Sequence, residues 1–235
     1  MTQIPAKPLL AVWWEALVTP DEAARLVVEP DAGRGLSRFL TVVIALLYAL
    51  YGAGMGLFRG AFPAAVSAAK LPMLYLLSLA VALPAFYVLN CLAGPRLGLR
   101  GVSRLLLLAV SANAAALASY APVAWFFALT TGRAEYEFIV LMHVVVFAVS
   151  GILSILVIGV VFRATARRLG MRFRPAFLFG WAALYGVVGS QMSWVLRPWI
   201  GSYEVPYTVL RSIEGSFFES VFQLIRSVIM APPSP

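Results

Sequence analysis

Five long runs of apolar residues dominate this chain, and short polar or arginine-bearing stretches separate them. A bilayer core about 30 Å thick is crossed by roughly 20 predominantly apolar residues in a helix, and each run is at least that long. The pattern therefore predicts an all-α fold, a polytopic membrane helix bundle with five transmembrane helices. The runs cover approximately residues 37–58, 71–94, 103–130, 136–162 and 175–198.

Prolines and glycines within the runs predict where the helices bend and where they pack closely. Pro84 lies in the second run, as does Pro72, and Pro122 lies in the third. Proline has no N–H to donate and clashes with the preceding turn, so we expect kinks at Pro84 and Pro122. Gly52 and Gly56 in the first run are four residues apart, a spacing that lets two helices approach closely. This spacing fits packing within one chain and association between copies.

A short helix is predicted ahead of the first run, over residues 20–29. Thr19 stands at the N-cap position, Pro20 at the first helical position and Glu22 three residues after the cap. This is a capping-box arrangement, and the proline lies where its missing N–H costs nothing.

A second amphipathic helix is predicted near the other end, over residues 216–230. Ser216 and Glu219 form another Ser-x-x-Glu box at its start. Roughly fourteen residues are too few to span a bilayer. The helix therefore lies in the outer interface, docks on a partner or covers the protein's own bundle, and the pattern favours none of the three.

Composition and charge agree with this architecture and orient it. Only 12% of the residues are charged, against about 25% in soluble domains, and 62% are hydrophobic. With the N-terminus inside, twelve of the eighteen lysines and arginines fall on the inner side, as the positive-inside rule favours. The high alanine and arginine content and the compact length are typical of bacterial proteins, so we expect a cell inner membrane, with a cytoplasmic N-terminus and a periplasmic C-terminus. The first thirty residues lack a signal-peptide pattern, so we expect the spans to direct insertion.

These expectations divide the chain into three parts. Residues 1–36 form a cytoplasmic N-terminal interfacial segment, in which Trp13 and Trp14 suit the lipid headgroup region. Residues 37–200 form the transmembrane domain of five helices. Residues 201–235 form an outer-face segment that carries the second amphipathic helix.

Five arginines gather in one inner loop and form a candidate docking site. A basic cluster at a membrane surface binds anionic headgroups or an acidic partner protein, or it serves only as a topology signal. Since the arginines of this chain lie in short loops rather than on one basic face, we expect no nucleic-acid partner. The five residues are Arg163, Arg167, Arg168, Arg172 and Arg174.

Polar side chains inside the apolar runs form a second candidate site. Asn113, His143 and Gln191 each lie on a different run, and Asn90 lies near the inner end of another, where water can satisfy it. Burying such groups unpaired in lipid is costly. They therefore predict an intramembrane polar network, which either holds helices together or lines a pore.

The residues needed for catalysis are missing from the apolar runs. The chain has two aspartates, Asp21 and Asp31, and both precede the first run. His143 is the single histidine, so neither paired carboxylates nor a histidine metal site is expected. Cys91, the one cysteine, is expected to be a buried thiol. We therefore predict no catalytic, cofactor-binding or metal-ligating residues, and a protein that is not an enzyme.

The end of the fifth run reads as an interfacial anchor. Arg197 can extend to water beside Trp194 and Trp199, which lie at the depth of the aromatic belt. Pro198 disfavours continuation of the helix there. The stretch is therefore a boundary of the membrane rather than an active site.

The layout resembles the Ypt-interacting-protein (Yip) domain family, in its bacterial form. The likeness covers about residues 37–200 and rests on the lead-in "WWEALVTPDE", the second run "AAKLPMLYLLSLAVALPAFYVLNCLAG" and the third run "RLLLLAVSANAAALASYAPVAWFFAL". The Asp-Leu-Tyr-Gly-Pro motif of eukaryotic members is missing, so no small-GTPase partner is carried over. The resemblance implies a non-enzymatic membrane protein that acts through partners and has no cofactor.

Two functional hypotheses follow from these patterns. The first is a scaffold or membrane-anchor subunit, whose partners are the lipid bilayer and the protein subunits of a larger complex. The alternative is a homo-oligomeric pore or a transporter of ions or small solutes, lined by Asn113, His143 and Gln191.

Overall fold

A computed structural model describes residues 7–29, 35–93, 97–132, 135–172, 175–201, 206–211 and 215–219. In these ranges the chain is all-helical, with eight helices and no strand. The helices are α1 (Leu9–Val18), α2 (Pro20–Val28), α3 (Leu36–Leu57), α4 (Ala61–Ala93), α5 (Leu99–Ser119), α6 (Ala121–Thr130), α7 (Tyr136–Arg168) and α8 (Pro175–Val195).

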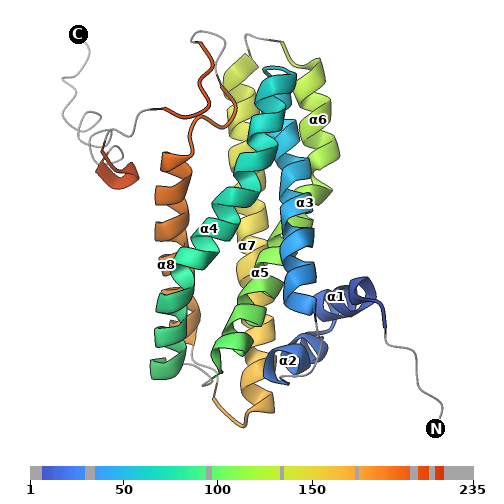
Figure 1. Cartoon of the computed structure of the whole chain (residues 1–235), viewed down its shortest axis with the longest axis vertical. Coiled ribbons are helices and arrows are strands. Elements are labelled where there is room, and N and C mark those ends of the chain that lie inside the picture. The colour runs from blue at the N-terminus through green and yellow to red at the C-terminus, as the bar shows by residue number, and fades with distance from the viewer. Residues whose placement is uncertain are drawn as a thin grey trace, which may run out of the picture.

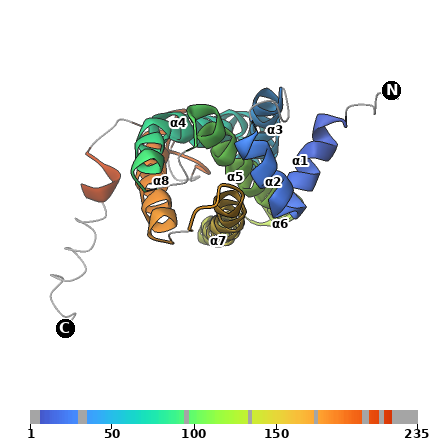
Figure 2. The same ribbon diagram turned by 90° about the horizontal axis from the view of Figure 1, so that it is seen from below.

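The long helices run side by side along the vertical axis of Figure 1, and the two N-terminal helices lie across one end of them. We call the end that carries α1 and α2 the collar end, and the opposite end the distal end. Seen from below in Figure 2, α1 and α2 flank α3, α5 and α7, whereas α8 stands beside α4.

Four helical segments of the described chain are long and apolar enough to cross a membrane, which makes this a multi-pass membrane protein. They are Leu36–Leu57, Ala61–Leu92, Leu99–Thr130 and Tyr136–Arg168. The first four predicted runs are thereby confirmed as long apolar helices. The fifth run forms α8, which packs along α4.

Several predicted ends are wrong. Helix α4 begins at Ala61 rather than at residue 71, because small and apolar residues extend the helix and Lys70 is buried within it. Helix α7 continues past residue 162 to Arg168, where it leaves the apolar run and packs against α2. Helix α8 stops at Val195, shortly before Pro198. Hydropathy locates the apolar part of a helix and not its ends. Helices α4 and α7 extend beyond their predicted apolar runs, and α8 stops before the end of its run.

The kink expected in the third run is confirmed as a break between α5 and α6. Tyr120 separates the two helices, and Pro122 follows as the second residue of α6. Proline has no N–H to donate and its ring clashes with the carbonyl of the residue four positions earlier, so α5 cannot continue through Pro122. At the second position of a new helix the missing N–H costs nothing, so the helix restarts here.

The N-terminal segment contains one helix that was predicted and one that was not. Helix α2 confirms the helix expected over 20–29, but the capping box is wrong: the Thr19 side chain makes no capping hydrogen bond, and the Glu22 carboxylate binds Arg25 instead. Helix α1 was not predicted. It packs on the bundle through Trp13, whose Nε1 donates to Ser111 Oγ at 3.0 Å.

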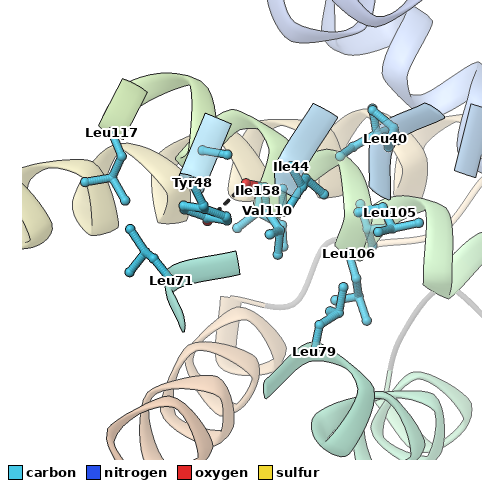
Figure 3. Close-up of a cluster of buried hydrophobic side chains, with 14 of the residues drawn as sticks. Leu40, Ile44, Tyr48, Leu71, Leu79, Leu105, Leu106, Val110, Leu117 and Ile158 are labelled. Atoms are coloured by element: carbon cyan, nitrogen blue, oxygen red, sulfur yellow. Dashed lines mark hydrogen bonds between the residues drawn. The ribbon is translucent and has the colours of Figure 1, made fainter. Parts of the chain in front are cut away.

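Apolar side chains of α3 form the centre of the core, as Figure 3 shows. Leu40, Ile44 and Tyr48 pack toward α5, and side chains of α4 and α7 complete the cluster. The surrounding residues are Leu71, Leu79, Leu105, Leu106, Val110, Leu117 and Ile158.

Helix α3 exposes an equally apolar stripe on its other side. Val42, Leu46 and Leu50 repeat at four-residue spacing and are exposed, as suits a face that contacts lipid. Cys91 was also expected to be buried because it lies in an apolar run, but it is exposed on α4. In a membrane helix an apolar environment is provided by lipid as well as by the protein core, so an apolar run does not imply burial.

Candidate functional site

The collar end brings the acidic residues of α2 beside the arginines that end α7. Arg167 Nη2 lies 3.4 Å from Asp21 Oδ1, and Arg168 Nη1 lies 3.5 Å from Glu29 Oε1. These pairs join residues that are far apart in the sequence, and they follow from the packing of α2 along α7. The collar end is therefore a mixed surface of acidic and basic side chains.

A buried arginine of α5 holds the end of α2. Arg104 is only 8% exposed, and its Nη1 donates to the backbone oxygens of Leu26 at 2.9 Å and Glu29 at 2.7 Å. Carbonyl groups in the last turn of a helix have no partner within the helix, and a cation there is attracted by the negative end of the helix dipole. Sequence reasoning counted Arg104 only as a topology charge, because its acceptors are backbone atoms that leave no sequence signal.

Helix α2 also carries an ion-pair network of its own. Arg25 Nη2 and Nε donate to the Glu22 carboxylate at 2.5 and 2.9 Å, and Arg25 Nη1 donates to Glu29 at 3.2 Å. The hydrogen bonds from Arg25 lower the pKa of the Glu22 carboxyl group from its ordinary value. The same hydrogen bonds raise the pKa of the Arg25 guanidinium. At neutral pH both groups are charged.

The structure describes four of the five arginines in the predicted docking set. Arg163 and Arg172 are exposed near the end of α7, and Arg167 and Arg168 form the pairs with α2. Arg174 lies outside the described residues. The Arg167–Asp21 side chains are 72% and 68% exposed, so water screens their attraction and the pair contributes little to stability. These charges remain accessible to a partner.

The three predicted polar residues of the membrane each bind a different group. Asn113 Oδ1 accepts from the Tyr48 hydroxyl at 2.8 Å, and its Nδ2 donates to the Ser150 carbonyl at 3.0 Å. The Tyr51 hydroxyl and His143 Nδ1 lie 2.8 Å apart.

Gln191 makes the third contact, since its Oε1 accepts from a backbone N–H of the segment after α8, at Phe217 and 3.2 Å. No hydrogen bond of the described chain joins Asn113, His143 and Gln191 to one another. Two of the partners, Tyr48 and Tyr51, were overlooked because a tyrosine in an apolar run reads as an apolar residue.

Asn90 is buried and is bound by the protein rather than by water. Its Nδ2 donates to the Leu97 carbonyl at 2.9 Å, across the connection from α4 to α5. The expectation that water satisfies this side chain is therefore wrong. The contact joins two chain segments that only the turn between helices brings together.

The distal end ties the segment after α8 to α4. Lys70 is buried, and its Nζ donates to the carbonyl oxygens of Pro198, at 3.0 Å, and Val209. The predicted anchor residues lie at the same end: the guanidinium carbon of Arg197 is 3.4 Å from the centre of the Trp194 ring. Trp199 Nε1 donates to the Ser193 carbonyl at 3.2 Å.

Glycines Gly52 and Gly56 lie where α3 meets α4. A Cβ atom added to Gly52 would stand 2.5 Å from the Ser67 carbonyl oxygen, and one added to Gly56 would stand 2.2 Å from that of Pro63. Both distances are far below van der Waals contact with backbone atoms. The two glycines are therefore placed at an intramolecular close approach.

The described residues contain no group of three or more His, Cys, Asp or Glu side chains that could hold a metal ion. Comparisons of the chain with protein-family models, with curated proteins and with solved structures found no match. The function is therefore argued from the geometry of the two ends and of the bundle between them.

Proposed function

We propose that this chain is a non-enzymatic scaffold or membrane-anchor subunit, and that a water-soluble partner protein binds at its collar end. The observation that carries this proposal is the mixed-charge surface built by Asp21, Glu29, Arg167 and Arg168, with α2 fixed by the buried Arg104. The sides of the bundle expose large apolar side chains, which suit lipid. A water-soluble partner that binds through polar contacts is therefore expected at the charged collar end.

The orientation and the fifth span belong to the same proposal. Helix α8 has 21 residues, which corresponds to roughly 30 Å at 1.5 Å per residue. That length suits a fifth span, and the positive-inside rule then favours a cytoplasmic collar end in a bacterial inner membrane. Five spans behind an N-terminal interfacial segment would also agree with the resemblance to Yip domains.

The arginines of the collar end provide the test. Replacing the four described arginines Arg163, Arg167, Arg168 and Arg172 by glutamine is expected to release a co-purifying subunit, because it removes the basic half of the surface. Native mass spectrometry after gentle extraction from the cells that make the protein measures the stoichiometry. The matched control is Arg211→Gln at the distal end, which leaves the collar unchanged. A partner retained by the fourfold variant would contradict collar docking and leave these arginines as topology signals.

The alternative, a homo-oligomeric pore or transporter, has less support. Asn113 and His143 are buried and bound to tyrosines of α3, and Gln191 binds the segment after α8. Groups engaged in this way stabilise helix contacts. If they line a path instead, replacing all three by apolar residues abolishes flux in reconstituted vesicles.

A further inference from the structure

A cavity of about 510 Å³ lies between α7 and α8, in the part of the molecule that the proposed docking surface does not use. Side chains of α3, α4 and α5 line it as well, among them Tyr48, Tyr75 and Asn113. The volume falls within the roughly 300–1,000 Å³ of small-molecule sites. Tyr48 and Asn113 lie near the middle of their apolar helices, so the cavity reaches the interior of the bilayer.

Glycines show that the cavity is open space. A Cβ atom added at Gly151 of α7, or at Gly186 or Gly189 of α8, would meet no atom within 4 Å. All three residues line the cavity. They differ in this respect from Gly52 and Gly56, which close a helix contact, and their small size keeps room between α7 and α8.

The cavity opens sideways, toward lipid. Its described lining includes the exposed residues Ala148 and Ile155 of α7 and Gly186 of α8, which mark the mouth. Their neighbours on the outer surface, such as Leu156 and Val187, are large, apolar and exposed. An occupant therefore enters from the bilayer and has an apolar body.

The polar groups of the lining call for a hydrogen-bond acceptor. Ser78 and Trp181 line the cavity, and their hydroxyl and indole N–H groups are buried without a hydrogen-bond partner among the described residues; the two residues are 1% and 7% exposed. Both polar atoms lie behind the cavity surface, so their side chains must rotate to reach an occupant. Buried donors are rarely left unpaired, and an indole N–H can only donate. The Tyr185 hydroxyl is already engaged, because it donates to the Tyr75 carbonyl at 3.3 Å.

The shape and charge of the lining restrict the chemical class of the ligand further. The rings of Tyr48 and Tyr75 are stacked with centroids 3.9 Å apart, and those of Trp181 and Tyr185 are stacked at 5.8 Å, so part of the wall is made of flat aromatic rings. The described lining carries no charged side chain. A phospholipid would have to pull its charged headgroup from the interface to reach these donors, which is costly at this depth.

We propose that this cavity binds a neutral lipid of the quinone class, a flat ring with carbonyl oxygens and an apolar tail. The ring lies beside the aromatic side chains, and its carbonyl oxygens accept hydrogen bonds from Ser78 and Trp181 once these side chains rotate toward the cavity. The tail leaves through the mouth between α7 and α8. The proposal concerns binding alone and is independent of the partner at the collar end.

The test uses the full chain in phosphatidylcholine nanodiscs and a decyl-tailed benzoquinone, with binding followed by quenching of tryptophan fluorescence and by native mass spectrometry. The unchanged protein is expected to bind saturably. Gly189→Leu fills the cavity and is expected to weaken binding about tenfold or more, whereas Gly180→Leu is the matched control, because Gly180 is also on α8 and in open space but does not line the cavity.

Two further variants test the donors. Ser78→Ala removes one donor and nearly keeps the shape of the wall, so it is expected to weaken binding roughly three- to tenfold. Trp181→Phe removes the other donor together with part of the ring, so a loss at least as large is expected, and native mass spectrometry measures it because the substitution also removes a fluorophore at the site. Circular dichroism and size exclusion establish that every variant is folded. Absence of saturable binding to the unchanged protein, or equal affinity in Gly189→Leu, would overturn the proposal. Equal binding of dioctanoylglycerol would overturn the assignment to a ring-bearing lipid.

Discussion

Single buried cations fix both ends of this bundle. Arg104 and Lys70 lie on helices that read as membrane spans, and each donates to two backbone carbonyl groups of a distant segment. A charge is buried at an acceptable free energy only when it is paired or hydrogen-bonded. These two residues are therefore structural, and their role comes from where the chain places the carbonyl groups.

Loss of Arg104 is expected to destabilise the collar. Arg104→Met replaces the guanidinium by an apolar group of similar unbranched shape and leaves the Leu26 and Glu29 carbonyl groups without their donor. Since a hydrogen bond to a charged group contributes about 1.5–3 kcal/mol, we expect the free energy of unfolding to fall by about that amount. Denaturant titration in detergent micelles measures it. Arg100→Met, at an exposed position of the same helix, is expected to have little effect.

Helix α2 is expected to lose stability in acid. The pKa of the Glu22 carboxyl group is lowered from 4.5 because Arg25 donates hydrogen bonds to it, so the folded state binds the proton less readily than the unfolded chain does. The stabilisation is therefore present above about pH 4.5 and is lost as the pH falls through the folded-state pKa. Hydrogen exchange of α2 amides, compared with those of α5, is expected to accelerate over that range.

Glu22→Gln provides the control for this pH dependence. The amide cannot ionise, so the difference in exchange between α2 and α5 is expected to become flatter with pH. A profile as steep as that of the unchanged protein would assign the effect to another group.

At the scale of the elements, close helix contacts depend on small residues at particular positions. Helix α3 meets α4 along Gly52 and Gly56, and its exposed stripe faces away from this contact. The Gly-x-x-x-Gly spacing indicated a close approach of two helices. It could not predict which helix is the partner, because the same spacing also serves association between copies. The structure places α4 there.

A methyl group at Gly56 is expected to force α3 and α4 apart. The added Cβ would stand 2.2 Å from the Pro63 carbonyl oxygen, and backbone atoms cannot rotate away as a side chain can. Overpacking of this kind costs about 1–3 kcal/mol, so Gly56→Ala is expected to lower the unfolding free energy by that amount. Gly151→Ala is the control, because Gly151 also lies inside a long apolar helix and a Cβ there meets nothing within 4 Å. Equal stability of the two variants would argue against the contact.

At the scale of the whole molecule, the number of membrane crossings decides which end faces which compartment. If the chain crosses the membrane four times, the segment before α3 and the segment after the last span lie on the same side of the membrane. If α8 is a fifth crossing, these two segments lie on opposite sides. The collar end and the segment after α8 lie at opposite ends of the molecule in Figure 1.

Accessibility of single cysteines tests the fifth crossing. In a Cys91→Ser background, Lys7→Cys and Pro206→Cys each provide one exposed thiol outside the bundle. If α8 spans the membrane, a membrane-impermeant maleimide added to intact cells labels Pro206→Cys, and labelling of Lys7→Cys requires disrupted cells. Labelling of both positions under the same condition would rule out the fifth crossing.

The sequence by itself determined an all-helical membrane protein and the approximate extent of its apolar helices, because bilayer thickness sets the length of an apolar run. The break at Pro122 was also readable, since proline acts through its own backbone. The ends of α4 and α7 were not, because the buried Lys70 lies inside α4 and donates to distant carbonyl groups, and α7 packs against α2 beyond the end of its apolar run.

Only the tertiary structure decided which apolar side chains face the core and which face lipid. Ile44 is buried and Leu46 is exposed, although both are apolar residues of one helix. In water the two faces of a helix differ in polarity and reveal their orientation. In a bilayer both surroundings are apolar, so the choice depends on how helices fit together, and so does the cavity lined by Ser78 and Trp181.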